Sequence, residues 1–257
     1  MKVLLVGDAH GNTNFMLHAF VVAEELGVTE IFQLGDFGVW PGLSGEMYLQ
    51  ALDGALERHP GLTLSFLDGN HEDFEQLEQF AADPDRQVGD GRVWVTPRIL
   101  WCPRGTVLRV AGRDVGFLGG AVSVDRHLRT PYVSWWPQEN LTPGDVDRLN
   151  VNSGGRLDVL LTHDAPASAD LGFDTAYRDG RWPDAAIEES KGTRLLLDEA
   201  VAANRPKVVA HGHWHLRHDT ETTSGGHTYR VHGLGHENDE ALAVLDLNTL
   251  TVSAVDL

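Results

Sequence analysis

Residues 2–12 read KVLLVGDAHGN, an apolar run that stops at a glycine and is followed at once by Asp8 and His10. The run is short and rich in Leu and Val, so it predicts a buried strand rather than a helix. Polar side chains that directly follow such a strand lie at its carboxyl end, where open α/β sheets bind their ligands. Asp8 and His10 are two residues apart, so in an extended chain their side chains point the same way. This stretch therefore predicts an α/β sheet with a binding site at its strand ends.

The alternation of strands and helices continues through the first third of the chain. Apolar runs predict further strands at residues 31–34 and 62–67. Helical spacing of apolar side chains predicts helices at residues 13–26, 47–56 and 72–80. The order strand, helix, strand is typical of parallel strands joined by right-handed crossovers.

Residues 93–124 have a different texture, with short β-rich runs separated by Pro and Gly. We interpret this stretch as a β-rich insertion. Further elements are expected at residues 142–149, 157–161, 193–203 and 207–210. Residues 229–234, 241–247 and 250–255 are expected as antiparallel strands. No linker, repeat or low-complexity tract divides the sequence, which predicts one domain over residues 1–257.

The composition limits the location and the partners of the protein. Among 257 residues, 20 Lys and Arg stand against 38 Asp and Glu, which gives a formal net charge of −18 and disfavours binding to long nucleic acids. The single cysteine, Cys102, excludes an intrachain disulfide and fits a reducing compartment. No apolar stretch is long enough for a signal peptide or a membrane span. We therefore expect a cytoplasmic protein without a membrane partner, and its oligomeric state stays open.

Five short polar segments share one property, because each follows an apolar strand and places metal-binding side chains at its end. They are residues 7–12 (GDAHGN), 35–38 (GDFG), 69–72 (GNHE), 162–164 (THD) and 212–215 (GHWH). Carboxylate, amide and imidazole ligands without thiolates suit Mn, Fe, Zn, Ni or Co better than Ca or Mg alone, and we favour Mn²⁺. The inventory matches the needs of two neighbouring divalent cations that share one carboxylate.

At these residues the sequence resembles the calcineurin-like metallophosphoesterase superfamily. The ordered motifs of that family are Asp-x-His, Gly-Asp, Gly-Asn-His-Asp/Glu, a lone His and Gly-His-x-His, and all five occur here in order. The resemblance implies an α/β fold that is a four-layer α/β/β/α sandwich, with two mixed β-sheets flanked by helices. It also implies a metal-dependent phosphoric ester hydrolase, either a phosphatase or a phosphodiesterase.

The resemblance further implies a role for each motif side chain. One metal ion would be held by Asp8, His10 and His215, the other by Asn70, His163 and His213, with Asp36 bridging the two. Two such cations acidify a bridging water towards hydroxide, which attacks phosphorus in line. His71, with an ordinary pKa of about 6.5, would protonate the leaving oxygen as the general acid.

The sequence departs from the protein Ser/Thr phosphatase branch of this family directly after Asp36. That branch continues the Gly-Asp motif into Asp-Arg-Gly, which supplies an acidic partner for the catalytic His and a cation for the phosphate. Phe37 and Gly38 stand here instead. The departure argues against a protein phosphatase and leaves both of those groups unassigned.

Candidates for contact with the substrate are chosen by position in the chain. We take Arg126 and His127, together with Asn70, as the substrate-binding residues, and Arg129 is the other candidate cation. The neighbouring pair of tryptophans at residues 135–136 is either a core or lid element or a wall on which a base stacks.

The preferred function is hydrolysis of a nucleotide or another small phosphoester. One alternative is a nuclease or phosphatase that acts on nucleic-acid ends with the same metal ions. The other is a non-catalytic metal-binding scaffold of the same fold, against which the complete ligand set and His71 argue.

Overall fold

The N-terminal strands form the centre of a seven-stranded sheet in the computed structural model, which describes residues 1–171 and 183–255. Four parallel strands lie side by side in it: β1 (Lys2–Val6), β2 (Glu30–Gln33), β3 (Thr63–Phe66) and β5 (Ile99–Trp101). Antiparallel strands complete both edges, namely β4 (Val93–Thr96) on one side and β12 (Leu242–Asp246) and β13 (Thr251–Ala254) on the other.

A second, six-stranded sheet is built from the later part of the chain. Its parallel strands are β7 (Arg113–Leu118), β8 (Val159–Thr162), β9 (Val208–His211) and β11 (His227–Gly233). The antiparallel strands β6 (Val107–Val110) and β10 (His218–Ser224) form its two edges. Both sheets are therefore mixed, as the resemblance implied.

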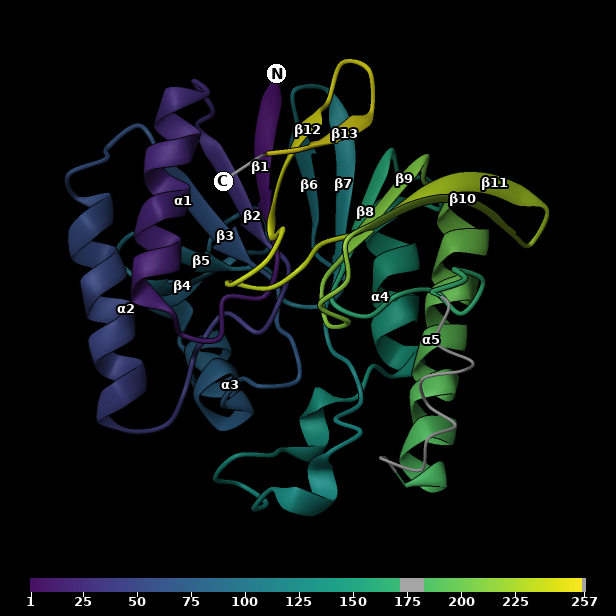
Figure 1. The fold of residues 1–257 in the computed structure, drawn as a ribbon, viewed down its shortest axis with the longest axis horizontal. Coiled ribbons are helices and arrows are strands. Elements are labelled where there is room, and N and C mark those ends of the chain that lie inside the picture. Colours follow the sequence, from purple (N-terminus) through teal and green to yellow (C-terminus); the bar gives the residue numbers. More distant parts are fainter. Residues whose placement is uncertain (172–182, 256–257) are drawn as a thin grey trace.

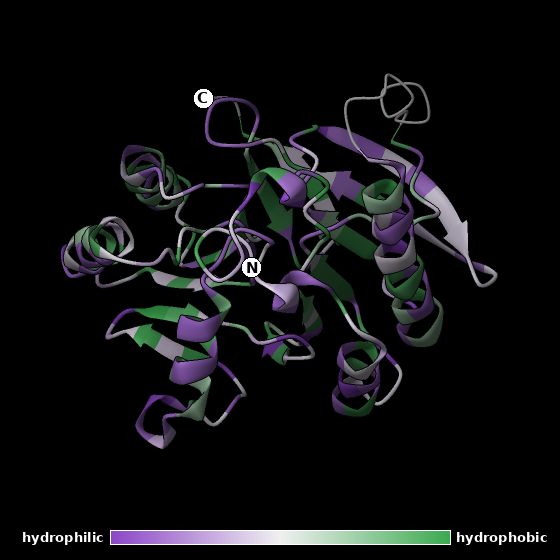
Figure 2. Cartoon of the chain, turned by 90° about the horizontal axis from the view of Figure 1, so that it is seen from below, coloured by the Kyte–Doolittle hydropathy of each residue, from purple (hydrophilic) through white to green (hydrophobic). Residues whose placement is uncertain are grey.

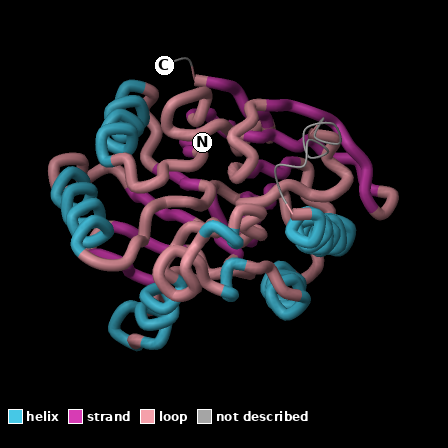
Figure 3. Tube along the Cα trace, turned by 60° about the horizontal axis from the view of Figure 1, so that its bottom comes forward, coloured by secondary structure: helices cyan, strands magenta, loops and turns pink. Residues whose placement is uncertain are grey.

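Helices cover the outer face of each sheet (Figures 1 and 3). On the first sheet lie α1 (Thr13–Glu25), α2 (Leu43–Leu56) and α3 (Phe74–Ala82), and on the second lie α4 (Pro143–Ser153) and α5 (Asp184–Asn204). The structure also contains the short 3-10 helices η1 (Pro84–Arg86), η2 (Arg126–Leu128) and η3 (Pro137–Glu139). Local sequence fixes the starts of α1 and α4, since Asn12 caps α1 and Thr142 forms a capping box with Asp145 at α4.

The alternation of side chains along β1 explains the four layers. Val3 and Leu5 point into the core between the two sheets, whereas Leu4 and Val6 pack towards the helices on the outer face. A third core fills the space between the second sheet and its helices. Figure 2 shows the hydrophobic strands in the interior between the helices. The α/β/β/α sandwich expected from the resemblance is confirmed.

Residues 93–124, expected as an insertion, contribute to both sheets. β4 and β5 close one edge of the first sheet, and β6 and β7 begin the second. Short strands separated by Pro and Gly look the same in sequence whether they are added to a sheet or carry the chain between two sheets. This segment is thus where the chain crosses from one sheet to the other.

Of the C-terminal strands, which were expected to be antiparallel, β12 and β13 do pair antiparallel, but the strands are divided between the two sheets. β11 pairs in parallel with β9 in the second sheet, whereas β12 pairs with β1 in the first. β10 has the sequence HDTETTS and no apolar side chain, so hydrophobic periodicity could not reveal it. In the described part of the chain, no helix combines the length and the apolar character needed to cross a membrane.

Candidate metal centre

The carboxyl ends of the parallel strands of both sheets point to the same side of the molecule, the lower side in Figure 1. The loops after β1, β2 and β3 carry Asp8, Asp36 and Asn70. From the second sheet, β8 is followed at once by His163, and the loop after β9 carries His213 and His215. The site is therefore assembled from both sheets.

Asp36 lies at the centre of this cluster and is 2 % exposed. Its Oδ1 accepts hydrogen bonds of 2.9 Å from the backbone N–H groups of Asn70 and His71. Nε2 of His163 lies 3.4 Å from Oδ1, and Nε2 of His10 lies 3.5 Å from Oδ2. Burial by itself would raise the pKa of Asp36, but the neighbouring His71 and His163 hold it well below its usual range. A carboxylate with one oxygen towards each side of the cluster is suited to bridge two ions.

Asp8 organises the second-sheet side of the cluster. Its Oδ1 accepts a hydrogen bond of 3.0 Å from the backbone N–H of His213, and its Oδ2 lies 3.1 Å from Nε2 of His215. The ring centroid of His215 is 5.0 Å from that of His10. Asp8, His10 and His215 thus converge as the resemblance implied for one metal ion.

Both ring nitrogens of His163 face oxygen atoms, so its neutral form would turn a lone pair towards other acceptors. Its Nδ1 lies 2.7 Å from the carbonyl oxygen of Leu34, so in the neutral ring Nδ1 carries the hydrogen. Its Nε2 then faces Oδ1 of Asn70 at 3.1 Å and Oδ1 of Asp36 at 3.4 Å. Burial disfavours the charged ring, yet Asp36 outweighs it and raises the pKa of His163 to about 10. Acceptors that face one another in this way need a proton or a cation between them.

Other proposed ligands also lie so close together that a proton or a cation must separate them. Burial lowers the pKa of His10, but hydrogen bonding and the charge of Asp36 raise it to about 10. Asp8, Asp36 and His163 each offer one ligand atom within 4.8 Å of the others, as do His10, Asp36 and His71. The residues present therefore fit divalent cations. The ring of His213 completes the expected set, with its centroid 5.0 Å from that of His163.

The backbone at the ligands is strained. Nine non-glycine residues of the described chain have positive φ, and four of them are the proposed ligands His10, Asp36, His213 and His215. Such conformations each cost of the order of 1–3 kcal/mol and persist where the surrounding structure imposes them. Four of the seven proposed ligands thus have backbone conformations that are unfavourable by themselves and that the surrounding structure must hold in place.

Two motif glycines allow the loops to approach so closely. A Cβ atom on Gly69 would lie 2.1 Å from Oδ1 of Asp36, and one on Gly212 would lie 2.0 Å from Oδ1 of Asp8. Any side chain at these positions would displace a proposed ligand.

Two buried polar side chains hold the ligand loops together. The Glu72 carboxylate accepts hydrogen bonds of 2.6 Å from the backbone N–H groups of Phe37 and Gly69, joining the loops after β2 and β3. Burial and the charge of Asp36 raise the pKa of Glu72 to about 8. Gln33 donates to the carbonyl oxygens of Gly7 and Gly35, which joins the loops after β1 and β2. Only Glu72 belongs to a motif, and its contacts could not be inferred from its position in the chain.

His71 lies at the rim of the cluster beside a cation. The terminal nitrogens of Arg129 are 2.6 Å from Nδ1 and 2.7 Å from Nε2 of His71, and Asp125 binds the same guanidinium through both carboxylate oxygens. Burial lowers the pKa of His71; the charge of Asp36 raises it, whereas that of Arg129 lowers it. The spacing of Asp125 and Arg129, four residues apart, was the only hint of this pair in the sequence.

The other expected substrate-binding residues are placed differently. Arg126 forms an ion pair of 2.5 Å with Glu189 of α5, and His127 is exposed. Asn70 does lie in the cluster, where its Nδ2 donates a 2.9 Å hydrogen bond to Oγ of Ser123.

The buried Glu139 orients the Asn70 amide through the hydroxyl group of Ser123. Oγ of Ser123 donates a 2.6 Å hydrogen bond to Oε2 of Glu139, and burial raises the pKa of Glu139 to about 7. These two hydrogen bonds turn the amide nitrogen of Asn70 away from His163 and the amide oxygen of Asn70 towards His163.

Trp136, in the same stretch, is 2 % exposed and packs in the core between the first sheet and its helices, so it is a core element and not a stacking wall.

His211 and a surface groove beside α2 do not extend the centre. His211 is buried and points its Nε2 towards Nε2 of His218, at 2.8 Å.

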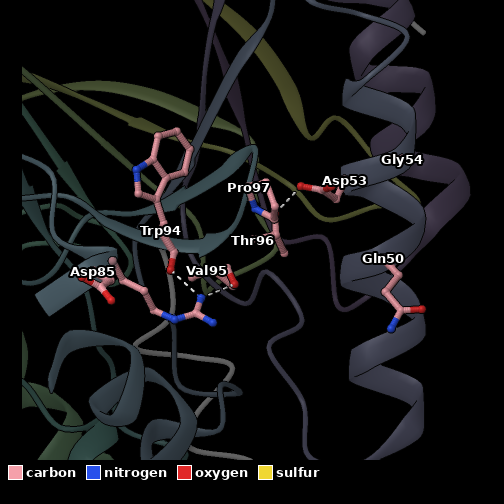
Figure 4. Close-up of a pocket in the computed structure, with 9 residues that line it drawn as sticks. Gln50, Asp53, Gly54, Asp85, Trp94, Val95, Thr96 and Pro97 are labelled. Carbon is pink, nitrogen blue, oxygen red and sulfur yellow. Dashed lines mark hydrogen bonds between the residues drawn. The ribbon is translucent and has the colours of Figure 1, made fainter. Parts of the chain in front are cut away.

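The surface groove, of about 560 Å³, lies between α2 and β4 (Figure 4). Its Asp53 accepts hydrogen bonds from Thr96 and Arg98, so this carboxylate fastens β4 to α2 rather than facing a ligand.

Comparison with known proteins agrees with this architecture. The family model described as calcineurin-like phosphoesterase matches residues 1–217. The crystal structure of TT1561 of Thermus thermophilus is similar, with a TM-score of 0.58 at 14% identity over 99% of this chain and 98% of that chain, which shows a shared fold. An archaeal protein described as a novel phosphodiesterase matches over 100% of both chains at 11% identity, with a TM-score of 0.44. No curated protein matches the sequence.

Proposed function

The chain belongs to the calcineurin-like phosphoesterase family, and we propose that it is a dinuclear metal-dependent phosphoesterase that acts on a small phosphoester or a nucleotide. The observation that carries this proposal is the central, buried Asp36, whose two oxygens face imidazole nitrogens from different strand ends. We propose Mn²⁺ as the metal, in a protein of the cytoplasm.

The chain offers two sets of ligands around that carboxylate. Asp8, His10 and His215 would hold one ion, and Asn70, His163 and His213 the other, with Asp36 shared. When bound, two divalent cations supply an acidified water as nucleophile and neutralise charge on the phosphoryl oxygens. The placement of Nε2 of His163 beside two oxygen atoms, with Nδ1 at the carbonyl oxygen of Leu34, supports this assignment.

His71 would hold the proton that the leaving oxygen needs. It is anchored by its own backbone N–H on Asp36 and keeps its ring at the rim of the cluster. A bound phosphate anion would offset the charge of Arg129 beside the ring and so favour the protonated imidazole. His71 can then donate its proton to the departing alkoxide.

Arg129 is the better candidate for the phosphate-binding cation than Arg126 or His127. Its guanidinium already reaches the ring of His71, and Asp125 fixes its direction with a bidentate pair. Arg126, by contrast, is engaged with Glu189 of α5. We therefore assign the contact with the phosphoryl oxygens to Arg129.

The test is hydrolysis by the metal-free chain before and after addition of Mn²⁺. The substrates are p-nitrophenyl phosphate, bis-p-nitrophenyl phosphate, 2′,3′-cyclic nucleotides and a short 5′-phosphorylated oligonucleotide. We expect Mn²⁺-dependent turnover of a small substrate. The variant Asp147→Asn, at an exposed position of α4, should retain it and serves as the control for Asp36→Asn. Turnover confined to the oligonucleotide would favour action on nucleic-acid ends. Two bound ions without turnover of any substrate would contradict the proposal and favour a scaffold.

A further inference from the structure

The loop between β11 and β12, residues 234–241, lies against the end of β1. The backbone N–H of Gly7 donates a 2.8 Å hydrogen bond to the carbonyl oxygen of Ala241, and Asp8 and His236 form an isolated β-bridge. A Cβ atom on Gly7 would lie 2.2 Å from the carbonyl oxygen of Gly235, so the glycine allows this close approach. The loop follows the part of the chain that the family model matches, residues 1–217. It contains none of the five motifs.

One side chain of this loop reaches a proposed metal ligand. Oε2 of Glu237 lies 2.8 Å from Nδ1 of His10, although the two residues are 227 positions apart. The other ring nitrogen of His10, Nε2, faces the centre of the cluster, 3.5 Å from Oδ2 of Asp36. The Glu237 side chain is 15% exposed and that of His10 is 21% exposed, so the contact is partly shielded from water.

This geometry determines which nitrogen of His10 can bind a metal ion. An ionised carboxylate only accepts hydrogen bonds, so the hydrogen of the neutral ring must stand on Nδ1. Nε2 then presents its lone pair to the cluster. Carboxylates that hold a histidine in this way orient the ring and raise its basicity towards the metal.

We propose that Glu237 is a positioning residue for the metal ion held by Asp8, His10 and His215, acting through the ring of His10. This inference rests on the proposed function, because it requires a metal ion at that set of ligands. Glu237 is absent from the groups of acidic and imidazole side chains, among the described residues, that are close enough to hold an ion together. It therefore acts on the ligand and is not a ligand.

His236 offers a second partner for the same carboxylate oxygen. Its Nδ1 lies 3.3 Å from Oε2 of Glu237, a longer contact than that of His10, and its ring centroid is 4.6 Å from that of His215. A role confined to His236 would leave the ring of His10 unaffected when Glu237 is changed. The experiment must therefore observe the metal site and the His10 ring separately.

The first measurement is calorimetric titration of the metal-free, full-length chain with Mn²⁺. We expect two binding events in the wild type, of which Glu237→Ala weakens one by about 10–100-fold and leaves the other unchanged. Glu237→Gln keeps the shape and one acceptor oxygen but loses the charge, so the same event should weaken less. Glu240→Gln, the same change at an exposed position of the same loop, should alter neither event.

The second measurement is proton and nitrogen NMR of the Zn²⁺-loaded chain. We expect a downfield Nδ1–H resonance of His10, assigned by its loss in His10→Ala, that moves upfield in Glu237→Ala and Glu237→Gln. If Glu237 only stabilised the loop, Glu237→Gln would leave the Nδ1–H resonance of His10 unchanged. The inference is overturned if this resonance is unchanged, or if both binding events weaken equally or not at all. A wild-type chain that binds no Mn²⁺ would overturn the proposed function itself.

Discussion

Asp36 and Arg129 both lie beside His71, but different means hold them in place. Asp36 follows a central strand, is buried, and receives backbone N–H groups from the neighbouring loop. Arg129 belongs to residues 123–139, here called the arm, which contain two 3-10 helices and expose Leu128 and Tyr132. Its side chain is held by its pairing with Asp125, its contact with His71 and a longer hydrogen bond to the carbonyl oxygen of Ser134.

This contrast explains why one group of residues forms recognisable motifs and the other does not. Groups that would bind metal are positioned by strand ends and backbone hydrogen bonds, which demand particular residues at fixed local spacing. Arg129 and Glu139 of the arm are positioned by side-chain contacts with Asp125 and Ser123. Such contacts leave little pattern in the sequence. The four predictions below test that contrast.

The largest effect is expected at the centre of the strand-end region. Asp36→Asn removes the charge that faces His10 and His163, so it should abolish binding of at least one metal ion and reduce turnover to background. Metal content after dialysis, together with the rate on the best substrate of the panel, measures both. Full metal occupancy in this variant would contradict the bridging role.

His71→Ala tests the residue that lies between the two regions. The variant should retain both ions but lose about 10²–10⁴-fold in kcat, because it removes the proposed general acid. The loss should grow as the pKa of the leaving group rises, since poor leaving groups depend most on protonation. Equal losses for good and poor leaving groups would argue against an acid.

Arg129→Ala tests the arm. We expect both ions to stay bound and kcat/KM to fall by about 10²-fold, as for loss of one preorganised contact to a developing charge. Arg126→Ala, the matched change three residues earlier, removes an ion pair with Glu189 and should alter kcat/KM little. If the two variants lose activity equally, the arm does not use Arg129 specifically.

The smallest effect concerns the base of the arm and appears in stability. Burial raises the pKa of Glu139 to about 7, so the folded chain retains its proton more strongly than the unfolded chain does. The stability from this protonated carboxyl is complete below the unfolded pKa near 4.5 and is lost as the pH rises to about 7. Glu139→Gln should therefore reduce the loss of unfolding free energy between pH 5 and 8 by at most about 2.5 kcal/mol.

Urea unfolding of the metal-free chain at several pH values measures this difference. Glu199→Gln, an exposed position on α5, serves as the matched control and should follow the wild type. A pH dependence that is identical in Glu139→Gln and in the wild type would mean that this carboxyl titrates normally in the folded chain.

Most of the central strands and the convergence of the proposed metal ligands follow from the sequence alone, whereas the four-layer sandwich was implied by its resemblance to a known family. Apolar periodicity and motifs are local properties, and parallel strands bring their carboxyl ends together without further information. β10, which lacks apolar side chains, and the crossing at residues 93–124 were not determined in this way.

By contrast, the side chains that hold the ligands, and the cation that contacts His71, become apparent only in the folded chain. The contacts of Glu237 with His10 and of Arg129 with His71 join residues 227 and 58 positions apart. Such pairs depend on where loops come to rest after the sheets have formed, and a lone Glu or Arg carries no local pattern that specifies it. Backbone-positioned groups are therefore readable from the chain, whereas groups positioned by distant side chains require the fold.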